Sequence, residues 1–241
     1  MSTTRTLRSL VIVVVSIVIG VGCTVRQEVE ISVTGGGEAT VEVELDRIMA
    51  AYLRDLGGLV GSAGDDVFDL DELSRAFSRR PAVRLRNATT PNPERLVIEA
   101  AFSDLSRVLS DEADVAGLFS FSRSGAERTL TITVNRATVE SALQLSPFGD
   151  DDAIMMLLPP AGAMSTDEYV EYLSWAFEEY DTPARVRRAV RDAEIALSVT
   201  VDGTVVRHTG GIRSGNIVRY RIPVAKLLIS PATTVYSVTF R

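Results

Sequence analysis

Few residues of this 241-residue chain could do nucleophilic chemistry, because it has one histidine and one cysteine. His208 lies in the stretch TVVRHTGG, with no serine elbow, cysteine partner or second metal-type ligand beside it, as a catalytic arrangement would require. We interpret it as a polar strand residue beside a turn. The glycines of TGGGEA, residues 34–39, lie between two segments of strand pattern, whereas a phosphate or dinucleotide loop leads into a helix. No cofactor is therefore expected.

The densest acidic run is Asp150, Asp151 and Asp152. Calcium prefers clustered oxygen ligands, but the alternate spacing and later glutamate of an EF-hand are missing. Acids placed before AIMMLL also complement the positive end of a helix, and we prefer that interpretation, so no metal site is expected. Two carboxylates that lie close in space could still hydrolyse a glycosidic bond. A secreted hydrolase that uses a carboxylate pair is therefore kept as an alternative function.

The stretch RVRRAVR places four arginines within seven residues, at Arg185, Arg187, Arg188 and Arg191. If it is helical, Arg188 is three residues from both Arg185 and Arg191, so these three are neighbours on the helix surface. That face could hold a phosphate or a carboxylate. Because the chain is acidic, pairing with the nearby EEYD is the preferred interpretation.

The apolar stretch AIMMLLPPAGAM, residues 153–164, is interrupted by Pro159 and Pro160 and cannot be one helix. Methionines adapt to irregular apolar partners, so this segment could line a lipid-binding lip or touch a membrane or a partner. The ordinary alternative is a short buried helix followed by a loop. The residues predicted to contact a ligand or partner are Ile154, Met155, Met156, Leu157, Leu158 and Met164.

The single thiol, Cys23, stands where an N-terminal apolar run ends. Arg5 and Arg8 precede an uncharged run from Ser9 to Gly22, which is the pattern of a signal peptide at 1–22. The run is shorter than the roughly 20 apolar residues that span a bilayer. A buried structural cysteine, or an uncleaved N-terminal anchor with an incidental cysteine, is the alternative.

Here the chain resembles bacterial lipoproteins, whose lipobox places small residues before an invariant cysteine. Val21, Gly22 and Cys23 fit that pattern, and Gly20 departs from the usual leucine as in the relaxed boxes of spirochaetes. The resemblance implies lipid attachment, including palmitate, at Cys23 and an extracytoplasmic place in the cell envelope or periplasm. Thr24 is not the aspartate that retains many lipoproteins at the inner membrane, which favours the outer membrane.

The remaining chain is acidic, with 25 basic residues less Arg5 and Arg8 against 32 acidic ones, a formal charge of −9. Nucleic acid is therefore not an expected partner, because phosphate neutralisation requires a basic surface. The expected partners are the membrane, through the lipid, and a lipid or an envelope protein.

Alternating segments around Gly35 to Gly37, within 82–109 and within 118–143 each predict a hairpin followed by a helix. Further strands are expected around Asp202-Gly203 and at 233–241. Asp69 with Glu72, and Ser165 with Glu168, have capping-box spacing. We predict an α+β fold of mainly antiparallel sheet, built from repeated hairpin-then-helix units with helices packed on it. Residues 23–241 form one domain, with a mostly helical insertion at about 147–192.

This order, a lipid-bearing cysteine soon followed by a hairpin, resembles that of LppM-like lipoproteins. The resemblance implies a compact α+β domain with a hydrophobic cavity that binds lipid or glycolipid. The expected function is therefore a membrane-anchored, non-catalytic envelope lipoprotein that binds an apolar ligand or a partner protein. The hydrolase above and a purely structural subunit of an envelope complex are the alternatives.

Overall fold

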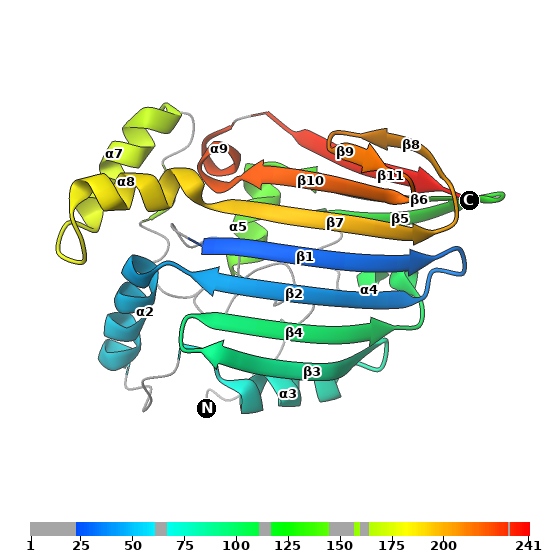
Figure 1. Ribbon diagram of the computed structural model, residues 1–241, viewed down its shortest axis with the longest axis horizontal. Helices are drawn as coiled ribbons and strands as arrows, with labels where there is room; N and C mark the ends of the chain where they lie inside the picture. Colours follow the sequence, from blue (N-terminus) through cyan, green and yellow to red (C-terminus); the bar gives the residue numbers. More distant parts are fainter. Residues whose placement is uncertain (1–22, 61–66, 111–116, 145–156, 160–163, 231) are drawn as a thin grey trace, which may run out of the picture.

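The computed structural model describes residues 23–60, 67–110, 117–144, 157–159, 164–230 and 232–241. Two sheets dominate the described part (Figure 1). The larger has seven strands in the order β3-β4-β2-β1-β7-β10-β9, and the smaller has four in the order β5-β6-β11-β8. Their bounds are β1 Cys23–Ser32, β2 Gly37–Leu45, β3 Val83–Asn92, β4 Arg95–Phe102, β5 Phe119–Ser124, β6 Glu127–Val134, β7 Glu194–Asp202, β8 Val205–Thr209, β9 Ile212–Ser214, β10 Ile217–Pro223 and β11 Thr234–Phe240.

The three predicted hairpins are confirmed as β1-β2, β3-β4 and β5-β6, each antiparallel. The turns need glycine where the backbone enters the left-handed region: Gly35 has φ 94° and Gly125 has φ 57°. Among the described strand pairs only β1 and β7 run parallel. The predicted α+β class with mainly antiparallel sheet is therefore confirmed.

The strands on either side of Asp202-Gly203 do not pair with each other. The β7 strand belongs to the larger sheet and β8 to the smaller, where β8 pairs with β11. Just after Gly203, Thr204 and Arg241 exchange two backbone hydrogen bonds of 2.8 and 3.1 Å. Those bonds hold the end of the chain beside the crossover, so this turn carries the chain from one sheet to the other.

Seven helices are described, and the two that follow Asp69 and Ser165 begin at the predicted caps. Asp46, Asp69 and Asp104 each accept a hydrogen bond from a backbone N–H two or three residues later, and Ser165 with Glu168 forms a complete capping box. The helices are α2 Arg47–Val60, α3 Leu70–Ser78, α4 Leu105–Ser110, α5 Arg136–Gln144, α7 Thr166–Ala176, α8 Pro183–Asp192 and α9 Val224–Ile229.

The helix α7 carries an apolar stripe but does not lie along a sheet. It packs against α8 and α9 beyond the ends of the strands, where Tyr169, Leu173 and Phe177 are buried (Figure 1). The stripe is real, but a helix–helix interface buries it. The helices α7 and α8 lie within residues 147–192, and the predicted helical insertion there stays a prediction because residues 147–156 and 160–163 lie outside the described residues.

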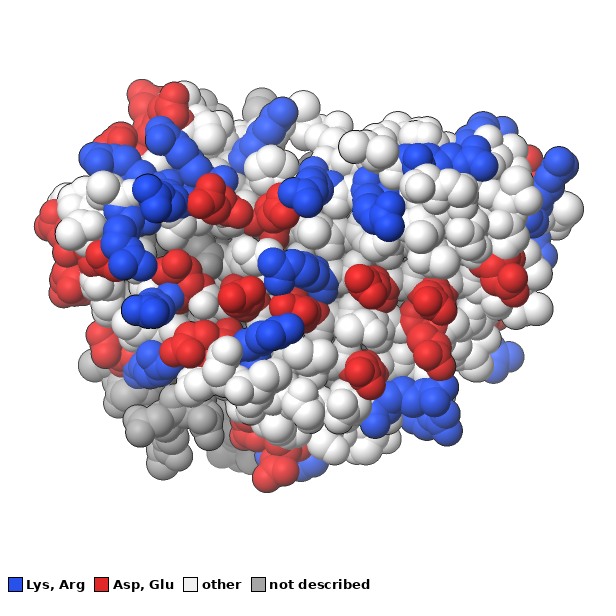
Figure 2. All heavy atoms as spheres, in the orientation of Figure 1, with Lys and Arg blue, Asp and Glu red and all other residues white. Residues whose placement is uncertain are grey.

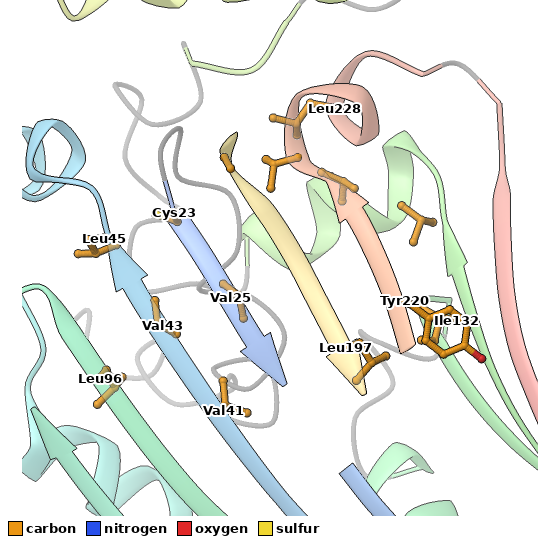
Figure 3. Packing of buried hydrophobic residues seen from close by; sticks show 14 of the residues in the cluster. Cys23, Val25, Val41, Val43, Leu45, Leu96, Ile132, Leu197, Tyr220 and Leu228 are labelled. Carbon is orange, nitrogen blue, oxygen red and sulfur yellow. The ribbon is translucent and has the colours of Figure 1, made fainter. Parts of the chain in front are cut away.

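The core lies on the inner side of the larger sheet. Alternate residues of β1 point inward, among them Cys23, Val25 and Ile31, and they meet side chains from β2, β4 and β7 (Figure 3). Gln27 is buried on the same face.

The outer face of the larger sheet carries charged side chains, and no helix of the described part of the chain covers it (Figures 1 and 2). On this face Arg26 lies 2.9 Å from Glu42, which also lies 3.1 Å from Arg95. Within the described residues, no helix is both long and apolar enough to cross a bilayer.

Candidate functional site

Cys23 is the first residue of β1 and pairs with Leu45, the last residue of β2. It therefore lies at the end of the larger sheet where α2, α8 and α9 gather (Figure 1). Its side chain is 1% exposed and belongs to the core beside Val25 and Leu45 (Figure 3). The predicted signal peptide, residues 1–22, lies outside the described residues.

A polar depression of about 290 Å³ adjoins this strand end. Three elements form it: the start of β1, the turn before α2, and the exposed face of α8. Asp46 is held there because its Oδ1 accepts a 2.9 Å hydrogen bond from the N–H of Ile48 at the start of α2. The lining residues are Thr24, Asp46, Arg185, Arg188, Ala189, Asp192 and Ala193.

Three of the four arginines of α8 are neutralised by nearby acids. Arg187 makes a two-pronged pair with Glu171 of α7 at 2.7 and 2.8 Å, and Arg191 lies 3.0 Å from Asp167. The hydrogen bond from Arg187 lowers the pKa of Glu171 below its ordinary value. These pairs fasten α7 to α8, which fixes the helix that lines the depression.

Arg185 lies 3.2 Å from Asp181, which belongs to the EEYD stretch, so this part of the predicted pairing is confirmed. Arg188 differs from its neighbours. It is exposed, and in the described part of the chain it has no ion-pair partner; the same holds for Asp192 one helical turn later. The depression therefore contains one arginine, Arg188, and one aspartate, Asp192, that form no ion pair with another described residue.

The apolar 153–164 segment is only partly described. Ile154, Met155 and Met156 lie outside the described residues. Leu157 is 7% exposed in the core, and its carbonyl accepts a 2.7 Å hydrogen bond from the hydroxyl of Tyr169. Leu158 and Met164 are half-buried and pack against the same core. Their predicted contact with a ligand or partner stays a prediction.

The other chemistry-bearing residues are far from this depression in the fold. His208 is exposed on β8, and its Nδ1 donates to the carbonyl of Gly210 at 3.1 Å, which is a contact within its own turn. Glu30 and Glu38 face each other across β1 and β2 on the outer face of the sheet. Asp150 to Asp152 lie outside the described residues. Among the described residues, no group of His, Cys, Asp or Glu is arranged so that it could hold a metal ion.

The chain matches no protein-family profile and no curated protein. It is similar to the NMR structure of the folded domain of LppM from Mycobacterium tuberculosis, with 13% sequence identity and a TM-score of 0.42 over 100% of this chain and 95% of that one.

The sequence identified the arginines of this site but not the acid that stands beside them. Asp192 ends α8 and Asp46 precedes α2. They come together because β1 pairs with β2 on one side and with β7 on the other, which places the start of α2 and the end of α8 at the same end of the sheet. The one local signal is the spacing of Arg188 and Asp192, four residues apart on a helix.

Proposed function

We propose that this protein is a lipoprotein of the cell envelope, made with a signal peptide at 1–22 and held outside the cytoplasm by a lipid on Cys23. The observation that carries the proposal is the signal-peptide and lipobox pattern that ends at Cys23 in the sequence. Thr24 and the residues after it pair with β2 and β7, so a chain cleaved before Cys23 keeps these strand pairs.

The same geometry predicts a short tether. Thr24, the next residue, already pairs with Glu44 on one side and Glu194 on the other, so no spacer separates the anchor from the sheet. A glyceryl group on the Cys23 sulfur would leave the core at the N-terminal end of β1. Only the strand pairing between Cys23 and Leu45 would have to break there. The domain would therefore lie directly against the membrane, with the α2 and α8 end facing it.

The test is mass spectrometry of the mature N-terminus from membranes, beside a Cys23→Ala variant. We expect a diacylglyceryl cysteine at residue 23 and release of the variant from membranes. Alanine is preferred to serine because a hydroxyl in the core would cost about 1–3 kcal/mol by itself. An unmodified Met1 start, with the variant still in membranes, would refute the proposal.

Val25→Ala is the matched control. Val25 is the next inward side chain of β1 and is equally buried, at 1% exposure. Its truncation weakens the same part of the core but keeps the thiol, so it should stay in the membrane fraction. Release of both variants would show that misfolding, and not loss of lipid, explains the result.

For the anchored domain we propose a non-catalytic role, in which it binds a lipid-like ligand or a protein of the envelope. The alternative hydrolase would have Glu30 and Glu38 as its opposed carboxylates, but these lie on an open sheet face and Glu38 is already paired with Arg86. Native mass spectrometry of the protein extracted from membranes tests the role. A noncovalently bound lipid or a copurified envelope protein supports it, and a chain that carries neither contradicts it.

The outer membrane is the proposed location, because Thr24 lacks the retention aspartate. Separation of inner from outer membranes by density, followed by detection of the protein, tests it. A Thr24→Asp variant that moves to the inner membrane would support the assignment, and an unchanged inner-membrane location of the unaltered protein would refute it.

A further inference from the structure

We infer that the depression beside Thr24 binds a zwitterionic lipid headgroup that carries both a phosphate and a primary ammonium, as phosphatidylethanolamine does. The inference rests on the proposed lipid anchor for its membrane setting, because the anchor brings this end of the domain to the bilayer. Its chemistry rests on the charged residues that line the depression together with Thr24: two arginines and two aspartates.

The basic side of the depression suits a phosphate. Arg185 and Arg188 are three residues apart on α8, so they share a face of the helix. The Nε of Arg185 lies 3.2 Å from Asp181, and no second acid among the described residues pairs with this guanidinium. Arg188 has no ion-pair partner there at all. Guanidinium groups bind phosphate oxygens in a planar two-pronged geometry, and the Thr24 hydroxyl can add a donor.

The acidic side suits an ammonium. Asp46 uses Oδ1 to cap α2, which leaves its second carboxylate oxygen available, and Asp192 is exposed without an ion-pair partner in the described residues. Arg188 and Asp192 do not pair with each other although they are four residues apart. In this order, with the cation nearer the helix N-terminus, such pairs are the weaker ones because the helix dipole disfavours them.

The presence of both arginines and aspartates in the depression indicates the class of ligand. A simple anion would be attracted by the arginines and repelled by both aspartates, so it would gain little. A headgroup with a phosphate and an ammonium places opposite charges on both sides of the depression. The volume of about 290 Å³ is at the small end of ligand pockets, which fits a headgroup and not a whole lipid.

The position of the depression fits a ligand that comes from the bilayer. It adjoins Thr24, the residue after the proposed lipid site. On the adjoining helix α7, Trp175 is 66% exposed, and tryptophan is the residue that most often marks a membrane–water interface. Figure 2 shows basic side chains gathered over α7 and α8 at this end of the molecule.

The test uses the full chain with Cys23→Ala, purified in a maltoside detergent that carries neither phosphate nor amine. Glycerophosphoethanolamine, the soluble headgroup, is titrated and followed by NMR of the arginine side chains. We expect saturable binding that is at least tenfold weaker in Arg188→Gln and in Asp192→Asn. Arg86→Gln is the matched control, because that arginine of β3 pairs with Glu38 of β2 and does not line the depression. Circular dichroism confirms that each variant is folded.

Two further probes separate the possible sources of the phosphate. Glycerophosphoglycerol and inorganic phosphate lack the amine, and both should bind at least tenfold more weakly than glycerophosphoethanolamine. Equal binding of all three, or an Asp192→Asn variant that binds normally, would overturn the assignment of a zwitterion. Absence of saturable binding would overturn the site itself. Because the chain with Cys23→Ala never carries a lipid, these outcomes are independent of whether Cys23 is lipidated.

Discussion

The hydroxyl of Tyr220 on β10 donates a 2.8 Å hydrogen bond to the carbonyl of Ser237 on β11, and so joins the larger sheet to the smaller one. The Tyr220 ring also meets Tyr236 edge to face, with 5.6 Å between ring centroids. Tyr220 is 1% exposed, so the bond lies away from water. One side chain therefore supplies both polar and apolar contact between the sheets.

Replacing Tyr220 by phenylalanine should lower the free energy of unfolding by about 1 kcal/mol, since a buried hydrogen bond is lost while the ring stays. Urea unfolding followed by circular dichroism measures this. Tyr236→Phe is the matched control. Among the described residues the Tyr236 hydroxyl has no hydrogen-bond partner, so this variant should lose less stability than Tyr220→Phe. Equal losses would mean that the bond to Ser237 contributes little.

Stability should also fall at alkaline pH. Burial raises the pKa of Tyr220 from 10.0 to about 12. Between these values the unfolded chain loses the phenolic proton and the folded chain keeps it, so stability is full below pH 10 and declines as the pH rises toward 12. Burial also raises the pKa of Tyr169 and Tyr180, which adds to the decline. Urea unfolding at a series of pH values should show a shallower decline in Tyr220→Phe, and identical slopes would contradict this.

The contribution of the α7 capping box to stability can be tested by comparing one substitution at the start of α7 with one at the start of α8. Ser165 accepts a hydrogen bond from the N–H of Glu168, whereas Thr182 begins α8 without a side-chain bond. Ser165→Ala should therefore lower the free energy of unfolding by about 1 kcal/mol, and Thr182→Ala by much less. Thermal unfolding of both variants would decide, and a larger loss for Thr182→Ala would be incompatible with this account.

That capping box also predicts a dependence on acid. The hydrogen bond from the Ser165 N–H lowers the pKa of Glu168 from its ordinary 4.5, so its contribution is present above that value and is lost as the pH falls below it. Glu168→Gln should match the unaltered protein in strong acid and differ from it near neutral pH. A difference that is the same at every pH would contradict the prediction.

The hairpin of β1 and β2 depends on Gly37 because of space, not because of its φ angle. A Cβ there would fall on the carbonyl oxygen of Glu30 and within 2.7 Å of the Phe102 ring. Gly37→Ala should therefore destabilise the fold by about 3 kcal/mol, in the range of overpacking. Gly125→Ala is the control, since its Cβ meets nothing within 4 Å and only its left-handed φ of 57° opposes alanine. That costs about 1 kcal/mol. Urea unfolding compares them, and equal losses would refute the steric account.

Trp175 tests the orientation that the short tether predicts. It is the only tryptophan in the chain, and it is 66% exposed at the α7 end of the molecule. In the lipid-bearing protein reconstituted into phosphatidylcholine vesicles, brominated acyl chains should quench its fluorescence. The Cys23→Ala protein in detergent gives the unquenched spectrum. Unquenched fluorescence in the vesicles would mean that another face of the domain meets the membrane.

The sequence by itself determined the local structure of this protein, because hairpins and helix starts depend on residues that are neighbours in the chain. Gly35 and Gly125 mark turns that need a left-handed backbone, and Asp69 and Ser165 cap the helices that follow them. The residues directly before Cys23 likewise identify it as the candidate site of lipid attachment.

Only the tertiary structure decided what these elements meet. The apolar stripe of α7 is the same whether a sheet or another helix buries it, and the pairing of β1 with β7 joins strands that are far apart in the chain. The depression follows from that pairing. Thr24, Asp46 and Arg188 come from three distant segments, and no local pattern could show that long-range strand pairing places their side chains around one space.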